Sequence, residues 1–177
     1  MRRLANLSPA QIAATIAALA FAAIAGAWGF ELAGYAPCEL CLAQRIPYYV
    51  GVPLAVGVAL LAQRGPSGLA RLGLALLALL FAGSAVFGLY HAGVEWGFWP
   101  GPTACTGALQ PGTFDSFLKD IKNTHVVQCD KVGVHVFGLS LAVWNAVVSA
   151  GLSALALAGA QIPLPFLTGE GRPEAPV

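Results

Sequence analysis

The chain has 177 residues, of which 58% are hydrophobic and only 10% are charged, and its formal net charge is +1. Because a typical soluble domain carries roughly 25% charged residues, this composition excludes an ordinary soluble protein. The few basic residues are scattered, which excludes a nucleic-acid-binding surface, and the length suits one domain.

Four stretches are long and apolar enough to cross a bilayer, which takes about 20 residues. They lie at about 11–30, 46–63, 72–91 and 136–158, and none contains Asp, Glu, Lys or Arg. Backbone groups in lipid must be hydrogen-bonded within the segment, so we predict an all-α membrane protein, a bundle of four transmembrane helices within residues 1–160. The remainder, 161–177, contains four prolines and is predicted to be a disordered tail.

The distribution of arginine and lysine predicts the orientation of the bundle. One side carries basic residues in short segments, namely Arg2, Arg3, Arg64, Arg71 and Arg172. The other side has Arg45 in a first loop at about 31–45, and three lysines spread over a second loop at about 92–135. The positive-inside rule therefore predicts that both termini are cytoplasmic and that both loops face outward, where disulfides persist.

The first outer loop contains Cys38-Glu39-Leu40-Cys41, directly before the second helix. Unpaired N–H groups at a helix N-terminus stabilise a thiolate, the reactive form of cysteine. A disulfide this short closes little chain and stabilises little by entropy, so redox chemistry is favoured over a structural staple. We predict no metal, because zinc would need four thiolates, which an oxidising compartment disfavours. A c-type haem would need His where Leu42 stands.

Arg45 lies four residues after Cys41, so it would share a face with that cysteine on a continuing helix. There it would stabilise a Cys41 thiolate and donate hydrogen bonds to a carbonyl oxygen of an oxidant. The alternative is an interfacial arginine that reaches lipid headgroups. Pro47 weakens the first interpretation, because it favours a helix that starts only near Ile46.

The second outer loop contains apolar residues at i, i+3, i+4 and i+7 over about 113–122, which predicts a short amphipathic helix. This helix would lie flat on the bilayer or pack on the outer face of the bundle. Cys105 and Cys129 bracket it, and a disulfide between them would close a loop of about 25 residues and contribute roughly 3 kcal/mol. The pair is either a structural staple or an exchange partner for the other two cysteines.

Ionisable and polar groups also occur at or within the apolar segments. His91 ends the third one and Glu95 follows four residues later. Such groups at the bilayer edge often mark a site, here one that assists protonation of a reduced oxidant; the alternative is hydrogen bonding at the interface. Ser140, Asn145 and Ser149 are expected to hydrogen-bond between helices.

Taken together, these motifs resemble the disulfide bond formation protein B (DsbB) family. The resemblance rests on Cys-Glu-Leu-Cys-Leu-Ala-Gln-Arg at 38–45, on Tyr90-His91-x-Gly93-Val94-Glu95, and on the single cysteines at 105 and 129. It covers about residues 10–158, and the combination is specific although each piece alone is weak.

The resemblance implies a bacterial inner-membrane protein that reoxidises DsbA, a periplasmic thioredoxin-fold oxidase, and passes electrons to ubiquinone or menaquinone. Carried onto this chain, it implies that the partner attacks Cys105 of a Cys105–Cys129 disulfide. Cys129 then attacks Cys38, and Cys41 becomes the thiolate that faces the quinone. Arg45 would hold quinone and thiolate together, with His91 and Glu95 nearby.

Three rival interpretations differ from this one. Vitamin K epoxide reductase-like proteins are also four-helix, cysteine-based and quinone-linked, but their CxxC lies late in the chain. A non-enzymatic scaffold with two structural disulfides would need no Arg45. A metal-binding protein would use all four cysteines on the outer face, and metal content would distinguish it.

Overall fold

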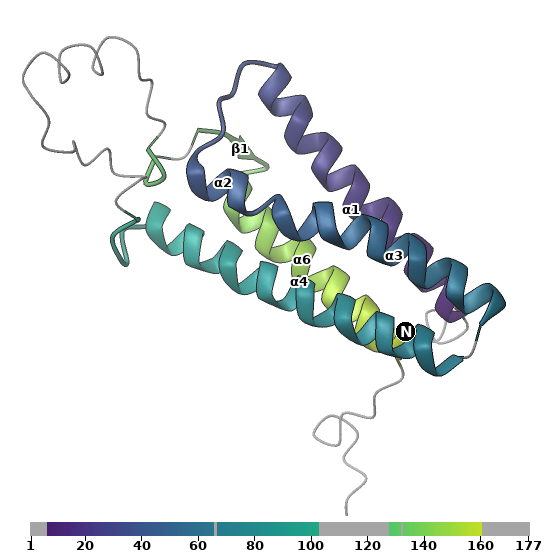
Figure 1. Cartoon of the computed structure of the whole chain (residues 1–177). Coiled ribbons are helices and arrows are strands. Elements are labelled where there is room, and N and C mark those ends of the chain that lie inside the picture. Colours follow the sequence, from purple (N-terminus) through teal and green to yellow (C-terminus); the bar gives the residue numbers. More distant parts are fainter. Residues whose placement is uncertain (1–6, 66, 103–127, 132, 161–177) are drawn as a thin grey trace, which may run out of the picture.

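The computed structural model describes residues 7–65, 67–102, 128–131 and 133–160. Four long helices run side by side, and a short helix and a two-stranded hairpin lie together at one end (Figure 1). The long helices are α1 (Pro9–Leu32), α3 (Ile46–Arg64), α4 (Ser67–Glu95) and α6 (Leu141–Ala160). The short elements are α2 (Glu39–Ala43), β1 (His135–Val136) and β2 (Leu139–Ser140).

Four spans in the described part of the chain are long and apolar enough to cross a membrane. At 1.5 Å per residue, even the 20 residues of α6 extend about 30 Å, the thickness of a hydrocarbon core. The predicted membrane bundle is therefore confirmed. The first three helices extend beyond their predicted ends, so that Glu31, Arg64, Arg71 and Glu95 lie within helices rather than in loops.

Local sequence explains where the helices begin. Ser8 and Gln11 form a capping box at the start of α1, in which the Ser8 Oγ accepts a hydrogen bond from the Gln11 backbone N–H at 3.2 Å. Pro47 occupies the first turn of α3, where its missing N–H is not needed. The chain therefore breaks between α2 and α3, as Pro47 led us to expect.

The fourth long helix begins later than predicted. Residues 135–140 form an antiparallel hairpin in which His135 pairs with Ser140 and Val136 with Leu139. Its two central residues, Phe137 and Gly138, have φ of 51° and 80°, as in a type I′ turn. Positive φ cannot continue a right-handed helix, so the predicted start near residue 136 was wrong, and α6 starts at Leu141.

A chain of hydrogen bonds links three helices inside the apolar bundle. The Tyr48 hydroxyl of α3 lies 2.9 Å from Asn145 Oδ1 and 2.9 Å from Ser149 Oγ, both on α6. Ser149 in turn donates to Ser84 Oγ of α4 at 2.9 Å. The predicted interhelical role of Asn145 and Ser149 is thus confirmed. In lipid such polar contacts and close packing replace the hydrophobic effect between helices.

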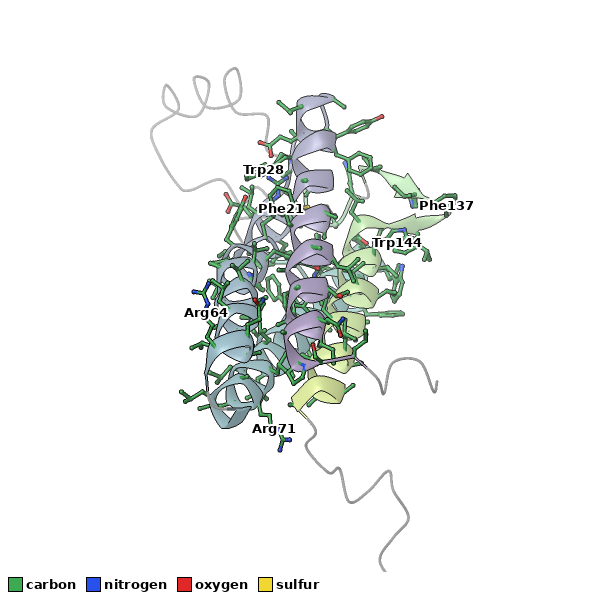
Figure 2. The ribbon with its side chains drawn as sticks, turned by 90° about the vertical axis from the view of Figure 1, so that its right-hand side faces the viewer. Phe21, Trp28, Arg64, Arg71, Phe137 and Trp144 are labelled. Atoms are coloured by element: carbon green, nitrogen blue, oxygen red, sulfur yellow. A yellow bond between two sulfur atoms is a disulfide. The ribbon has the colours of Figure 1, made fainter. Side chains whose placement is uncertain are left out.

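The two ends of the bundle differ in character. The start of α1, the end of α6 and the turn between α3 and α4 share one end, where Gly159 packs against Ile12 and Leu74. Arg64 and Arg71 lie toward this end and Phe137 toward the other (Figure 2). The Cys38–Cys41 segment and the hairpin share that second end (Figure 1). The predicted amphipathic helix at 113–122, Cys105 and the predicted tail at 161–177 lie outside the described residues.

The contact between α4 and α6 depends on Gly88, which yields a test. A Cβ at this position would lie 2.8 Å from the Ala146 backbone nitrogen and 3.0 Å from its Cα. We predict that Gly88→Ala destabilises the protein by about 1–3 kcal/mol, because the two backbones must separate. The midpoint of thermal unfolding in detergent measures this.

Gly83 on the same helix is the matched control, because a Cβ there has no atom within 4 Å. Gly83→Ala should be neutral or should stabilise by up to about 1 kcal/mol, the helix preference of Ala over Gly. Equal midpoints for the two variants would contradict the close packing of α4 on α6.

Candidate active site

Cys38 and Cys41 form a disulfide at the start of α2. Cys38 is the N-cap residue, with extended backbone, and its Sγ accepts a hydrogen bond from the Cys41 backbone N–H at 3.1 Å. Pro37 precedes Cys38. A proline disfavours helical backbone at the residue before itself, which keeps the chain extended where it leads into the CxxC motif. Cys38 is only 5% exposed, whereas Cys41 is partly exposed.

Cys129 packs into the same buried cluster as Cys38. The cluster also contains Leu40 of α2 and Val94 of α4, and Cys41 packs against it. Cys129 is 1% exposed and is itself disulfide-bonded. Three of the four cysteines selected from the sequence therefore meet at one end of the bundle, although about 90 residues separate Cys38 from Cys129. Cys105 lies outside the described residues.

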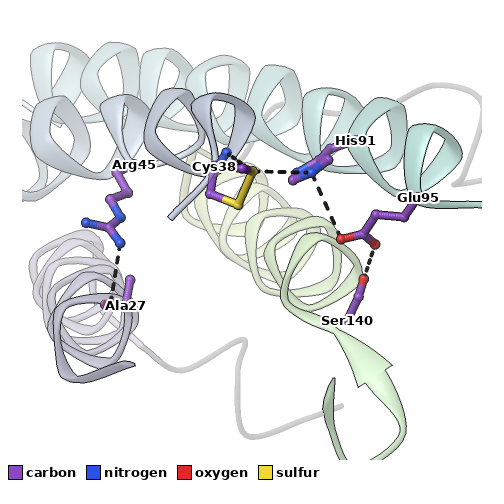
Figure 3. Close-up of a disulfide and its surroundings, with 7 residues drawn as sticks. Ala27, Cys38, Arg45, His91, Glu95 and Ser140 are labelled. Carbon is purple, nitrogen blue, oxygen red and sulfur yellow. Dashed lines mark hydrogen bonds and ion pairs between the residues drawn. A yellow bond between two sulfur atoms is a disulfide. The ribbon is translucent and has the colours of Figure 1, made fainter. Parts of the chain in front are cut away.

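His91 and Glu95 extend the site along α4 (Figure 3). His91 Nε2 lies 3.7 Å from Cys38 Sγ, within hydrogen-bonding range of sulfur, and the side chain is 2% exposed. Glu95 Oε1 lies 4.0 Å from the same Nε2, and Glu95 Oε2 accepts a hydrogen bond from the Ser140 hydroxyl. A continuous line of polar groups thus runs from Cys38 through His91 and Glu95 to Ser140, as Figure 3 shows.

Arg45 occupies a different place from the one its spacing suggested. It is the N-cap of α3, after the break that follows α2, so it does not share a continuous helix with Cys41. Its guanidinium points to α1, where one nitrogen donates to Glu31 Oε2 at 2.6 Å and the other to the Ala27 carbonyl at 3.4 Å. Figure 3 shows the arginine directed toward Ala27, away from Cys38. The two interactions hold its charge beside the cysteines without a direct contact.

A cavity of about 300 Å³ joins these residues. Its polar lining includes Cys38, Cys41, Gln44, Arg45, His91 and Glu95. Its apolar lining comes mainly from α1 and α6 and includes Ala23, Ile24, Phe30, Trp144 and Val148. Pockets that bind small molecules combine such an apolar wall with a few polar groups that fix orientation.

Two residues of this site were missed in the sequence. Glu31 holds the Arg45 guanidinium, and the signal that could have found it is a carboxylate at the end of an apolar span. Gln44 is 7% exposed, and its Nε2 has no hydrogen-bond partner among the described residues. A buried donor without a partner costs free energy, so this amide is available to donate to an acceptor inside the cavity.

Comparison with known proteins decides the family. Residues 9–159 match the family described as disulfide bond formation protein DsbB. This chain belongs to the DsbB family. No curated protein and no solved structure matches the chain. The resemblance found in the sequence is thereby confirmed. Membership makes the chain a multi-pass membrane protein of disulfide bond formation, consistent with its four apolar spans and its CxxC disulfide.

The unequal burial of the two CxxC cysteines predicts unequal reactivity. After chemical reduction, Cys41 should react with a maleimide faster than Cys38, because Cys38 is 5% exposed inside the buried cluster. The rates are measured by mass spectrometry on Cys38→Ser and Cys41→Ser chains that also carry Cys105→Ser and Cys129→Ser. In sodium dodecyl sulfate the two rates should converge. Equal rates in the folded chain would show that burial does not control access to these thiols.

Proposed function

We propose that this chain reoxidises a periplasmic dithiol oxidase of the DsbA type and passes the electrons to a membrane quinone. The observation that carries the proposal is the burial of Cys129 in the same cluster as Cys38, whose disulfide with Cys41 lines the cavity. Thiol–disulfide exchange needs an attacking thiolate within reach of a disulfide sulfur. A buried cluster that contains both cysteines supports this proposal, because it keeps them at the same end of the bundle and away from other thiols.

The proposed relay moves two electrons through four cysteines. A thiolate of the partner attacks Cys105 of a Cys105–Cys129 disulfide, which forms a mixed disulfide and releases Cys129. Cys129 attacks Cys38, which breaks the Cys38–Cys41 bond and leaves Cys41 as a thiolate. The second thiol of the partner then displaces Cys105, and the partner departs oxidised. Cys105 finally attacks Cys129, so that its disulfide re-forms and both Cys38 and Cys41 are left reduced.

The described residues fit a quinone in the cavity. Gln44 Nε2 is a buried donor without a partner among the described residues, and Arg45 presents a second donor from the same wall. An apolar groove lined by Leu19, Leu155 and Ala158 continues between α1 and α6 and shares Ala23 and Val148 with the cavity. Such a groove suits an isoprenoid tail. A quinone held by these residues would supply the acceptor for the two electrons and two protons that leave when the Cys38–Cys41 disulfide re-forms.

Roles for the remaining polar groups follow from their positions. His91 Nε2 is placed to exchange a proton with the Cys38 sulfur, and Glu95 is the next group along the line. Arg45 raises the positive potential beside the sulfurs, which favours thiolate over thiol. The Glu31 carboxylate limits this effect, because it neutralises part of the charge and fixes the guanidinium on α1.

For orientation, we propose that the cysteine end faces the periplasm of a bacterial inner membrane and that the Arg64–Arg71 end faces the cytoplasm. The support is the density of arginine at that end of the bundle (Figure 2). Disulfides persist in the periplasm and are reduced in the cytoplasm. Both termini would then be cytoplasmic, because α1 starts and α6 ends at the arginine end.

The relay predicts separable defects for its cysteines. In detergent, with a reduced DsbA-type protein as donor, the parent chain should reduce ubiquinone or menaquinone analogues, followed by ultraviolet absorbance. Cys41→Ser should abolish quinone reduction while still forming a mixed disulfide with the donor, because the outer pair remains intact. Cys105→Ser should lose both quinone reduction and formation of the mixed disulfide. Full quinone turnover by Cys41→Ser, or no turnover by the parent with either quinone, would overturn the proposal.

The cavity donors predict a selective effect on quinone affinity. Arg45→Ala should raise the apparent KM for quinone by roughly tenfold, because a hydrogen bond from a charged donor contributes about 1.5–3 kcal/mol. The KM for the protein donor should change far less. Arg64→Ala is the matched control, because Arg64 ends the same helix outside the cavity. An unchanged quinone KM in Arg45→Ala would remove that residue from the quinone site.

A further inference from the structure

The two cysteines of the CxxC motif and His91 form a group with a second kind of chemistry. Their two sulfurs and one imidazole nitrogen lie within 4.8 Å of one another. We propose that the reduced Cys38–Cys41 pair and His91 form a zinc site that exists only when the disulfide is open. The site itself rests on described geometry, and only its consequence for turnover rests on the proposed function.

The distance between His91 and Cys38 already suits tetrahedral zinc. With Zn–S of about 2.3 Å and Zn–N of about 2.05 Å, a tetrahedral angle puts the two ligand atoms about 3.6 Å apart. His91 Nε2 and Cys38 Sγ are 3.7 Å apart in the structure. A zinc ion can therefore be placed between them without moving either α2 or α4.

The disulfide prevents metal binding while it is intact. Two thiolates on one zinc ion lie about 3.8 Å apart, so the sulfurs must separate, which reduction of their bond permits. The Cα atoms of Cys38 and Cys41 are 5.0 Å apart, so rotation of the side chains is sufficient. A sulfur in a disulfide carries no negative charge and is a poor ligand, whereas a thiolate binds zinc strongly. The site is thus switched by the redox state of its own ligands.

Surrounding residues complete the coordination shell. His91 is 2% exposed and Cys38 is 5% exposed, so water competes weakly for these ligands. Glu95 Oε1 lies 4.0 Å from His91 Nε2 and offers an oxygen ligand after a small rotation; water in the cavity is the alternative. Two thiolates, one imidazole and one oxygen form a set that zinc accepts, so the four thiolates expected from the sequence are not required. All three protein ligands line the cavity, which gives the ion a route in.

Binding involves proton release and no electron transfer. Each thiol loses its proton to solvent, and two Zn–S bonds and one Zn–N bond form. The two electrons that opened the disulfide come from the partner dithiol of the proposed relay, or from a chemical reductant in a test. Thiolates held on zinc cannot re-form their disulfide, so zinc should stop quinone reduction until a chelator removes it.

The test uses the full chain in detergent with Cys105→Ser and Cys129→Ser, so that only the CxxC thiols remain. After reduction with a phosphine, which does not chelate as a dithiol does, Co²⁺ is added as a spectroscopic probe. One equivalent should give thiolate-to-cobalt charge transfer and the visible bands of a tetrahedral ion, and Zn²⁺ should displace it. The oxidised chain, with identical sequence, should show neither band.

Two histidine variants separate the site from adventitious binding. His91→Ala should weaken Zn²⁺ affinity by about tenfold or more, because it removes a ligand. His135→Ala is the matched control and should bind as the parent does, because this exposed histidine on β1 is not part of the ligand group. If the oxidised chain binds Co²⁺ as the reduced chain does, or if His91→Ala leaves the affinity unchanged, the site does not exist.

A comparison within the wild-type chain separates this proposal from the proposed function. Quinone reduction with a DsbA-type donor is measured with Zn²⁺ and then with excess chelator. Zinc that binds and reversibly inhibits supports both proposals. If the reduced chain binds cobalt but no quinone is reduced when chelator is present, the relay is overturned and the metal site is retained. Electron transfer at the same rate with and without saturating zinc overturns the predicted block.

Discussion

The contact between the C-terminal end of α4 and the CxxC disulfide is the constraint on which the rest of this structure depends. It brings His91 and Val94 to a sulfur that belongs to a five-residue helix, α2, which is too short to be stable alone. The disulfide is held at the bundle end because Cys38 and Leu40 are buried there together with Cys129. Without that cluster, α2 would have no fixed position relative to the cavity. The chemistry of the site and the packing of the bundle end are therefore the same set of contacts.

An apolar bundle gains little from burying more apolar surface in lipid, so its specificity must come from small residues and polar groups. In this bundle the small residues and the polar groups act at different contacts. Gly88 lets α4 approach the backbone of α6, Gly51 leaves room for the Phe81 ring, and the Tyr48–Ser149–Ser84 hydrogen bonds align α3, α6 and α4 at the part of the cavity that Tyr48 lines. In the proposed relay, such a framework would hold the walls of the cavity in place while the cysteines exchange disulfide partners. A redox site that must change its covalent bonds in each cycle benefits from a base that does not move.

Much of the fold and part of the site could be predicted from the sequence, for different reasons. Helices of 20 residues without charge follow from the properties of lipid, and the break before α3 follows from Pro47. The hairpin could not be predicted, because the apolar run from Val136 to Leu139 reads as the start of a helix and lacks the usual Asn-Gly turn. Glu31 and Gln44 were not predicted, because their roles depend on contacts between distant segments of the chain. No local spacing in the sequence encodes such contacts. The proposed roles of the cysteines came from motif and family resemblance rather than from periodicity.

The ion pair between α1 and α3 has a consequence for turnover. Glu31 is 46% exposed, so its carboxylate remains hydrated when its partner moves away. The Arg45 side chain is 11% exposed, so the pair is open to water mainly at its carboxylate, and separating it costs less than separating a fully buried pair. In the proposed function, Arg45 would leave the carboxylate for an oxygen of the quinone and return to it when that molecule departs. A tighter, buried pair would hold the arginine permanently, and an arginine without a partner would retain its ligand too long. A weak ion pair with Glu31 would therefore let Arg45 bind and release its ligand in every proposed turnover. Such release is needed if the product leaves the site into the bilayer.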